Sequence, residues 1–465
     1  MLYYIIKMAT VNFPKSFDMA SKQPPVPCSS FISRFRSDNS TYTTNSSGSV
    51  DTIRIQIPCG GRGQYLMPND SFITFKMTPT IASLTAGTVK IDSCAYSLFR
   101  RCRVLHGSTV LIDINNCGRL WNALRDVQVP ASARVRDEVC LLADADSAAG
   151  TNANNYLAGV SLTSGQVYDA AFVLPVGLLG SLSKNAVPLC LMGGSDLFLE
   201  LELNPANVAE TTRVFATPDG AVGVATTANH TLSIALSDIY YSAKIVEIPD
   251  PYQSILLQAY STMPVMLPAI DYVADMKVIA SGSSVINEKL AISRSSCNAI
   301  FWWFSNSNVA NGVINNYNYN DGVTHRQGCA LDTYTVQVSG NNLLEVRSGV
   351  GATGYFLGSQ PLLQLQRVFN QSVQDGLGVL GLSVYCNATD TYASASAVTK
   401  RFVGSYSLEK YDADSGFQSG MNLIGQDVRL VVNLTSATTE SQNLYVFGMS
   451  DVLYEIREGL AYVRA

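Results

Sequence analysis

Histidine is the scarcest of the side chains that could carry chemistry, with three copies in 465 residues: His106, His230 and His325. Only His106 has a second type of metal ligand close by, because Cys102 stands four positions before it. A tetrahedral zinc site needs three or four placed ligands, and no further Cys or His pair follows. We therefore expect no metal site. We interpret His106 as a residue of a tight turn, and we expect His230 and His325, in polar segments, to face solvent.

The sequence lacks motifs for nucleophilic or phosphate chemistry. It has no G-x-S-x-G elbow and no Walker A loop. The run Gly60-Gly-Arg-Gly63 resembles a phosphate loop, but it separates two predicted strands, so we interpret it as a turn. Asp144 and Asp146 form a carboxylate pair without the apolar surroundings that would separate their pKa values. We expect no catalytic, cofactor-binding or metal-binding residues, and the chain is predicted not to be an enzyme.

The densest basic cluster is the run RRCR that begins at Arg100. On a strand, Arg101 and Arg103 would face one side and Arg100 the other. We expect these arginines to pair locally with carboxylates such as Asp92 or Asp113. The alternative is a contact across a subunit interface, where arginine is favoured.

The overall charge excludes several classes of partner. The formal net charge is −5, so we expect no sequence-specific nucleic-acid binding and no general attraction to anionic lipid. The first 50 residues have a mild basic bias, which we interpret as a polar tail, and contact with a polyanion is the alternative. No apolar run approaches the ~18 residues that would span a bilayer, so no transmembrane segment is expected.

The composition indicates that little of the protein surface is exposed to solvent. Charged residues make up 14% of the chain, against a typical ~25%, while hydrophobic residues make up 47%. Such a chain is either very compact or covered by copies of itself. The 10 cysteines are scattered, with no CxxC pair, which favours free thiols in a reducing compartment. The apolar stretch after Met1 is too short for a signal peptide, and Met8 is an alternative start.

An internal repeat organises the chain. Residues 232–248 read LSIALSDIYYSAKIVEI, and residues 444–463 read LYVFGMSDVLYEIREGLAYV. Each copy has an apolar strand, Ser-Asp, a β-branched residue, Tyr and a second apolar run. A cleanly alternating strand precedes each copy, at 197–203 and at 428–434. A repeat near half the chain length predicts two tandem copies of one β-rich domain.

The remaining periodicities fill out these two copies. Further strands are expected at 53–57, 71–77, 89–91, 103–106, 109–113, 297–304, 376–385 and 401–411. Helices are expected at 94–99, 117–127, 175–184 and 361–374. Long loops are expected at 130–170, 204–230, 305–331 and 387–399.

The predicted fold is all-β: two tandem eight-stranded jelly-roll β-sandwiches, a double jelly roll with short inserted helices. We expect an extended N-terminal arm at 1–48 that orders against a partner, a first jelly roll at 49–248 and a second at 249–465. Pro249-Asp250-Pro251 marks the boundary between the two.

Several stretches resemble the double jelly-roll major capsid proteins of polintons, polinton-like viruses, virophages and adintoviruses. Residues 97–108, SLFRRCRVLHGS, with Asp113-Ile114 and LWNAL at 120–124, resemble the signature of the family's first domain. The segment 178–203 fits the same family. Four stretches near the C-terminus resemble the closing pattern of the family's second domain: FVGSYSLE at 402–409, SGMNL at 419–423, the strand 428–434 and Ser450-Asp451.

The resemblance implies a structural role without a cofactor. Such proteins form homotrimers whose six sandwiches make a pseudo-hexagonal capsomer, and these capsomers tile an icosahedral viral shell around a DNA genome. The partners implied are neighbouring capsomers, penton proteins and minor or cement capsid proteins, and the location implied is the virion. The four long loops would include the outward towers, and the arm would run along the inner face or tie neighbouring capsomers together.

Two other function classes stay open from the sequence. A two-domain β-sandwich could bind a glycan or receptor through aromatic loops, for example with Tyr317 and Tyr319. A sandwich-fold hydrolase is the third hypothesis, although no particular carboxylate can be nominated for it.

Overall fold

The structure is a computed structural model. It describes residues 28–44, 51–81, 88–92, 94–128, 139–142, 158–183, 185–204, 212–215, 232–250, 253–254, 258, 264–306, 326, 331–350, 356–357, 359–368, 402–409, 420–438 and 441–464.

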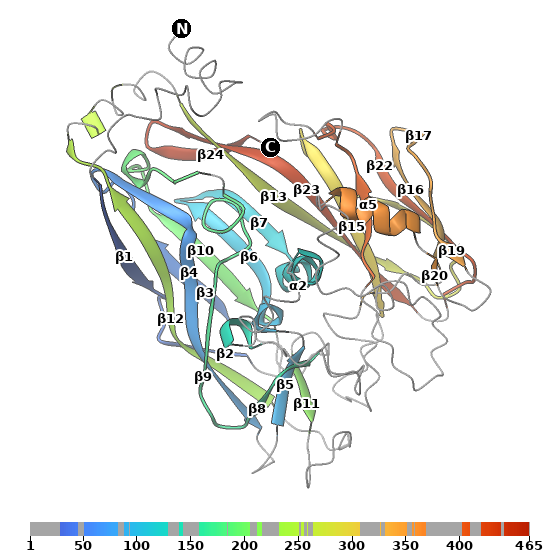
Figure 1. The fold of residues 1–465 in the computed structure, drawn as a ribbon, viewed down its shortest axis with the longest axis horizontal. Helices are drawn as coiled ribbons and strands as arrows, with labels where there is room; N and C mark the ends of the chain where they lie inside the picture. The colour runs from blue at the N-terminus through green and yellow to red at the C-terminus, as the bar shows by residue number, and fades with distance from the viewer. Residues whose placement is uncertain are drawn as a thin grey trace, which may run out of the picture.

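The first sandwich consists of two facing antiparallel sheets with the strand orders β1-β12-β4-β9 and β3-β10-β6-β7 (Figure 1). β2 (Thr41–Thr44) also pairs with β12, and a small sheet β11-β5-β8 stands beside the sandwich. The eight strands are β1 (Ser29–Arg36), β3 (Thr52–Ile57), β4 (Gln64–Ile81), β6 (Phe99–His106), β7 (Thr109–Asn115), β9 (Tyr168–Phe172), β10 (Leu197–Leu203) and β12 (Leu232–Glu247). The small sheet comprises β5 (Thr88–Asp92), β8 (Ala158–Thr163) and β11 (Thr212–Phe215).

The second sandwich has the sheet orders β13-β23-β15-β21 and β14-β22-β16-β17, where β18 continues the pairing of β17 along β16. β24 (Leu460–Arg464) folds back on β23. The strands are β13 (Val265–Ile279), β14 (Val285–Lys289), β15 (Cys297–Asn306), β16 (Leu331–Val338), β17 (Asn341–Asn342), β18 (Val346–Arg347), β21 (Gly404–Ser407), β22 (Val428–Leu434) and β23 (Gln442–Arg457), with β19 (Gly349–Val350) and β20 (Phe356–Leu357) as a separate pair.

The two sandwiches have the same topology. In chain order, strands β1, β3, β4, β6, β7, β9, β10 and β12 take the same sheet positions as β13, β14, β15, β16, β17 with β18, β21, β22 and β23. In each copy a helix follows the fifth strand: α2 (Cys117–Gln128) in the first and α5 (Ser359–Val368) in the second. This arrangement confirms the predicted all-β fold of two jelly rolls with short inserted helices.

The alternating strands fold as their periodicity predicts. β10 and β22 both bury every second residue: the leucines of both strands, with Val428 and Val432, enter the core, while Glu200, Glu202, Arg429 and Asn433 lie on the outer face. Aromatic side chains fill the space between the sheets: Phe75 packs against Phe99 and Phe172 in the first sandwich, and Trp302 packs against Tyr334 in the second. Fully burying one such side chain contributes roughly 1.5–3 kcal/mol.

The predicted helix at 175–184 is wrong. This segment forms successive turns in which Ser181 N–H bonds the Leu174 oxygen and Leu182 N–H bonds the Val176 oxygen. A Cβ at Gly180 would clash with the Leu174 oxygen. The apolar spacing reflects burial of a loop, which glycine allows to fold tightly, rather than a helix.

The prediction of an extended N-terminal arm is also wrong for part of its range. Residues 29–36 and 41–44 of the arm at 1–48 pair with β12 as β1 and β2, so they belong to the first sandwich. Their polar composition hid this strand, because β1 is an edge strand with exposed side chains. Residues 1–27 lie outside the described part. We retain residue 249 as the proposed boundary, which falls between the last strand of one sandwich and the first of the other.

The predicted loops at 130–170 and 204–230 contain strands as well. β8 and β11 lie within them and pair with β5, and β9 begins within the first of them and pairs with β4. Small and polar side chains gave these strands no periodicity of their own. The strand predicted at 376–385 and the loop at 387–399 lie outside the described residues, as does most of 305–331. Within the described residues, no helix is long and apolar enough to cross a membrane.

Candidate functional site at the junction of the two sandwiches

His106 lies where the two sandwiches meet. It is buried at the end of β6, where Nε2 lies 2.9 Å from the Ser195 oxygen and 3.1 Å from the Met192 oxygen. Its Nδ1 lies 3.1 Å from the backbone nitrogen of Ala461 in β24. Because that N–H must donate to Nδ1, the geometry assigns the neutral tautomer, with the proton on Nε2. His106 is thus the last residue before the predicted turn, and its role is to join the sandwiches.

The turn between β23 and β24 enters the first sandwich beside this histidine. The backbone N–H of Gly194 donates to the Gly459 oxygen at 3.0 Å. A Cβ on Gly194 would stand 2.9 Å from that oxygen, and Gly459 itself has a φ of +81°. Glycine is therefore required on both sides of this contact, because the two backbones approach too closely for a side chain.

A second contact lies along the free edge of β13. Ser183 forms an antiparallel bridge with Ala269, and Ile270 N–H donates to the Leu182 oxygen at 3.4 Å. In the same loop, a Cβ on Gly177 would stand 2.8 Å from the Tyr454 hydroxyl oxygen. The loop between β9 and β10 thus covers an edge that would otherwise expose unpaired backbone groups.

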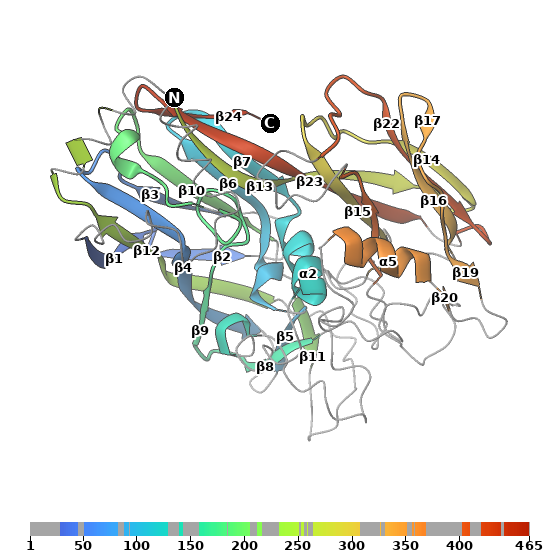
Figure 2. The same ribbon diagram turned by 45° about the horizontal axis from the view of Figure 1, so that its top comes forward.

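The helix α2 makes the third contact. The Arg119 guanidinium carbon lies 4.3 Å from the centre of the Tyr445 ring, a cation–π geometry. Tyr445 stacks with Trp303 on the neighbouring strand, and Trp303 stacks with Phe447. β7 beside the helix also contacts β13 and β24. Figure 2 shows α2 between the first sandwich and the sheet that holds β13, β15 and β23.

Asp271 is the acidic group of this junction. It is buried on β13, and its Oδ2 accepts a 2.9 Å ion-pair contact from Arg294. Burial raises the pKa of Asp271 to about 6, while Arg294 and the Tyr272 N–H lower it and the charge of Asp113 adds to the rise. No described His, Cys, Asp or Glu joins a group of three or more that could hold a metal ion.

The arginine cluster pairs within the first sandwich, as predicted. Arg101 donates twice to Asp113, at 2.7 and 2.6 Å. Arg103 pairs with Glu200 at 2.7 Å, which the sequence did not indicate because β10 is almost a hundred residues away. These pairs span the outer face of neighbouring strands, a half-exposed setting in which each contributes about 1 kcal/mol or less.

The other residues singled out from the sequence take ordinary structural positions. Gly60–Gly63 forms the predicted turn between β3 and β4, with positive φ at Gly60 and Gly63. All eight described cysteines are free thiols. Burial raises the pKa of the Cys59 thiol to about 12, and it also raises the pKa values of Cys102 and Cys117, so these thiols resist ionisation. His230, His325, Asp144, Asp146, Tyr317 and Tyr319 lie outside the described residues.

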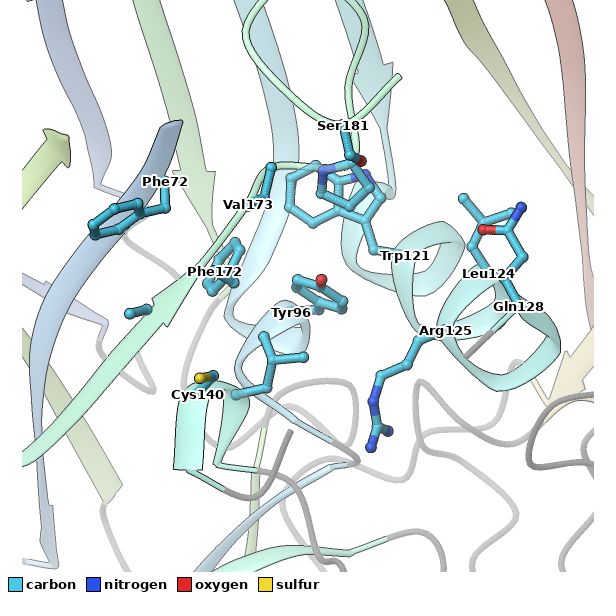
Figure 3. Close-up of a pocket in the computed structure, with 13 residues that line it drawn as sticks. Phe72, Tyr96, Trp121, Leu124, Arg125, Gln128, Cys140, Phe172, Val173 and Ser181 are labelled. Atoms are coloured by element: carbon cyan, nitrogen blue, oxygen red, sulfur yellow. The ribbon is translucent and has the colours of Figure 1, made fainter. Parts of the chain in front are cut away.

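A cavity of about 460 Å³ opens next to α2 (Figure 3). Tyr96, Trp121 and Phe172 are among the aromatic residues of its wall, and Arg125 and Gln128 line it from the helix. The rings of Tyr96 and Phe172 pack edge to face, with their centroids 5.0 Å apart.

Comparisons with known proteins place the fold. No protein-family model matches the sequence, and no curated protein matches it. Several solved structures match over nearly the whole chain. VP54 of PBCV-1, in a crystal structure fitted into a cryo-EM reconstruction of the virophage Sputnik, has a TM-score of 0.54 at 13% identity, covering 95% of this chain and 98% of VP54.

Two further structures are major capsid proteins. The Faustovirus protein has a TM-score of 0.51 at 11% identity, covering 98% of this chain and 96% of its own. The mavirus protein has a TM-score of 0.50 at 10% identity, covering 97% and 95%. The chain therefore has the double jelly-roll fold of these proteins, as the resemblance in its sequence implied.

Proposed function

We propose that this chain is a major capsid protein, the structural unit of an icosahedral shell around a viral DNA genome. The observation that carries the proposal is the duplicated jelly roll, which occupies the chain from β1 to β24 and is shared with the Faustovirus and mavirus major capsid proteins over nearly their full length. Fold alone does not fix function. The low content of charged residues and the junction between the two sandwiches also support this function.

The junction supports a building block rather than two independent modules. Backbone hydrogen bonds, a buried histidine and a cation–π contact join the sandwiches at three places. A fixed angle between the two sandwiches lets three chains present six equivalent prisms, the pseudo-hexagonal outline that tiles a shell. A charged content of 14% agrees with extensive burial between copies.

The role that we propose for the chain is structural and non-enzymatic. The partners we propose are other copies of the chain, as a homotrimer and as neighbouring capsomers, together with penton and minor or cement capsid proteins. The location we propose is the virion. The segments at 130–170, 204–230, 305–331 and 387–399 are proposed to include the outward towers.

Light scattering coupled to size exclusion tests this function. A mass of three chains that resists dilution, followed by shell-like particles in electron microscopy, is the expected result. A stable monomer would contradict it. In that case retention on a glycan matrix would support the alternative, a two-domain β-sandwich that binds a glycan or receptor.

A further inference from the structure

The contact between the two sandwiches uses different surfaces on its two sides. The first sandwich contributes the turn after β6, β7, the helix α2 and the loop between β9 and β10. The second contributes the free edge of β13 and the β23–β24 turn. Because the sandwiches share one topology, each surface has a counterpart on the other sandwich. A head-to-tail contact of this kind leaves both counterparts open within one chain.

The counterpart on the second sandwich carries exposed apolar side chains among polar ones. It consists of the turn after β16, the strands β17 and β18, the helix α5 and residues 420–427 before β22. Three large apolar side chains stand on these elements: Leu344 is 69% exposed, Leu363 59% and Ile424 51%. We call these three residues the leading surface.

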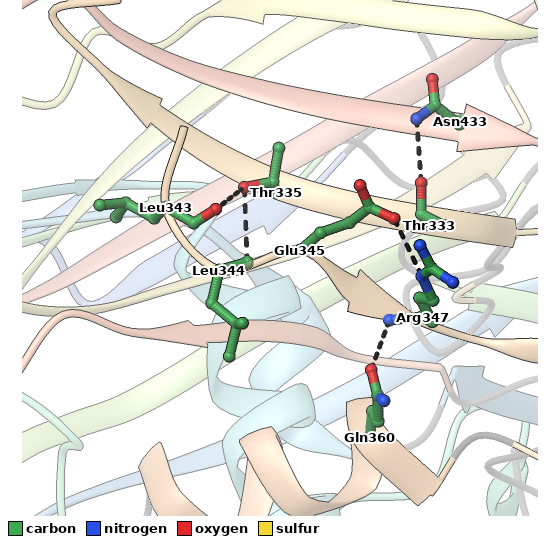
Figure 4. Close-up of polar contacts among 8 residues, drawn as sticks. All are labelled: Thr333, Thr335, Leu343, Leu344, Glu345, Arg347, Gln360 and Asn433. Atoms are coloured by element: carbon green, nitrogen blue, oxygen red, sulfur yellow. Dashed lines mark hydrogen bonds and ion pairs between the residues drawn. The ribbon is translucent and has the colours of Figure 1, made fainter. Parts of the chain in front are cut away.

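The backbone of the leading surface is held in place (Figure 4). The Thr335 hydroxyl donates to the oxygens of Leu343 and Leu344, at 3.1 and 3.5 Å, and the Tyr406 hydroxyl donates to the Leu344 oxygen at 2.9 Å. Arg347 N–H donates to the Gln360 side-chain oxygen at 2.7 Å, which ties β18 to α5. Leu344 is therefore an exposed apolar side chain on a fixed backbone, so little ordering is needed when a partner covers it.

The counterpart on the first sandwich is β1. This strand takes the sheet position of β13, but none of its eight residues is buried, and Phe31 and Ile32 are 39% and 59% exposed. On β13, by contrast, Ala269 and Asp271 are buried beside the first sandwich. We call β1 the trailing surface. Figure 1 shows β1 at one end of the molecule and β16 and β17 at the other.

We propose that the leading surface of one copy binds the trailing surface of a second copy, repeating between chains the contact made within each chain. A head-to-tail contact that repeats closes into a ring when its rotation allows, and three chains give a ring of six sandwiches. Exposed edge strands such as β1 are natural places for such a partner. This inference rests on the proposed function, because it names the surfaces by which the trimer forms.

Complementary variants test the pairing of these two surfaces. Leu344→Arg damages the leading surface, Ile32→Asp damages the trailing surface, and Val285→Arg is the matched control. Val285 is 65% exposed on β14, at the opposite edge of its sheet from β17 and β18. Native mass is measured by light scattering over a concentration series, and circular dichroism checks that each variant is folded. Leu363→Arg replaces Leu344→Arg if that variant fails to fold.

We expect wild type and Val285→Arg to be trimers and each of the other two variants to be a monomer. An equimolar mixture of Leu344→Arg and Ile32→Asp should form dimers but no trimers, because only one intact pair of surfaces is available. A trimer from either single variant, or a mixture that stays monomeric, overturns the inference. A monomeric wild type overturns the proposed function instead.

Discussion

Nδ1 of His106 accepts a hydrogen bond from the backbone N–H of Ala461 at 3.1 Å, although 355 positions separate the two residues in the sequence. The same ring donates from Nε2 to backbone oxygens of its own sandwich, at 2.9 and 3.1 Å. One buried side chain therefore satisfies polar backbone groups of both jelly rolls. Its loss would leave these groups without partners in a dry setting.

We predict that His106→Ala destabilises the chain by about 2–4 kcal/mol, since it removes buried hydrogen bonds and leaves a cavity. The measurement is the free energy of unfolding in urea. Val110→Ala is the control, because Val110 belongs to the same hairpin but is exposed. An equal loss in both variants would contradict a joining role for His106.

The sequence predicted those parts of the fold in which local pattern and tertiary burial agree. The strand 197–203 alternates because one of its faces is buried, and it is observed as β10 with the same bounds. The helix at 117–127 is observed as α2 from Cys117 to Gln128. In these segments the apolar residues repeat with the period of the strand or helix that they form.

The failures have a common physical cause. Residues 175–184 are apolar because they are packed against β13 and the core, and the glycines within them allow turns that a helical pattern cannot show. β1 was missed because an exposed edge strand has no buried face to mark it. His106 was recognised as the end of a hairpin, but its partner Ala461 comes from the other end of the chain, and no local signal points there.

Thiol chemistry should follow burial. We predict that Cys28, which is exposed, is alkylated rapidly in the native protein, while Cys102 and Cys117 react only after unfolding. Burial raises the pKa of both buried thiols, so the reactive thiolate is scarce as well as inaccessible. Mass spectrometry of peptides after timed labelling with iodoacetamide measures each site separately. Rapid labelling of Cys102 in folded protein would contradict the packing of β6.

The close approach of Gly177 to Tyr454 gives a test of the β13 contact. Gly177→Ala should destabilise the chain by roughly 1–3 kcal/mol, because the new Cβ would lie 2.8 Å from the Tyr454 hydroxyl. Gly193→Ala is the control, since a Cβ there meets its neighbour at an ordinary 3.5 Å.

The partner variant Tyr454→Phe removes the oxygen that the new methyl group would meet. In the double variant Gly177→Ala with Tyr454→Phe, we expect the cost of the alanine to fall by at least half. Urea unfolding of the four proteins gives the coupling between the two positions. Additive losses would show that the two sandwiches are not in contact at this point.

Asp271 makes the folded chain more stable at low pH than at neutral pH. Its folded pKa of about 6 lies above the ordinary value of 3.8, so the folded chain holds the proton more tightly than the unfolded chain does. The contribution of this proton to the free energy of unfolding is fully present below about pH 4 and is lost as the pH rises through about 6. The contribution amounts to roughly 3 kcal/mol at most. Arg294, Asp113, Tyr272 and Tyr454 are the ionisable groups around the carboxyl.

Asp271→Asn removes this proton uptake, so the difference in melting temperature between wild type and variant should change in favour of wild type as the pH falls from 7 to 4. Asp238→Asn is the control: Lys76 lowers the pKa of Asp238, so the stability that Asp238 contributes is present above the ordinary pKa of 3.8 and is lost only as the pH falls below about 4. The difference in melting temperature between wild type and Asp238→Asn should therefore stay nearly constant from pH 7 to 4. Parallel curves for wild type and Asp271→Asn across this range would mean that Asp271 is not buried at the junction, and the contact along β13 would then need a different arrangement.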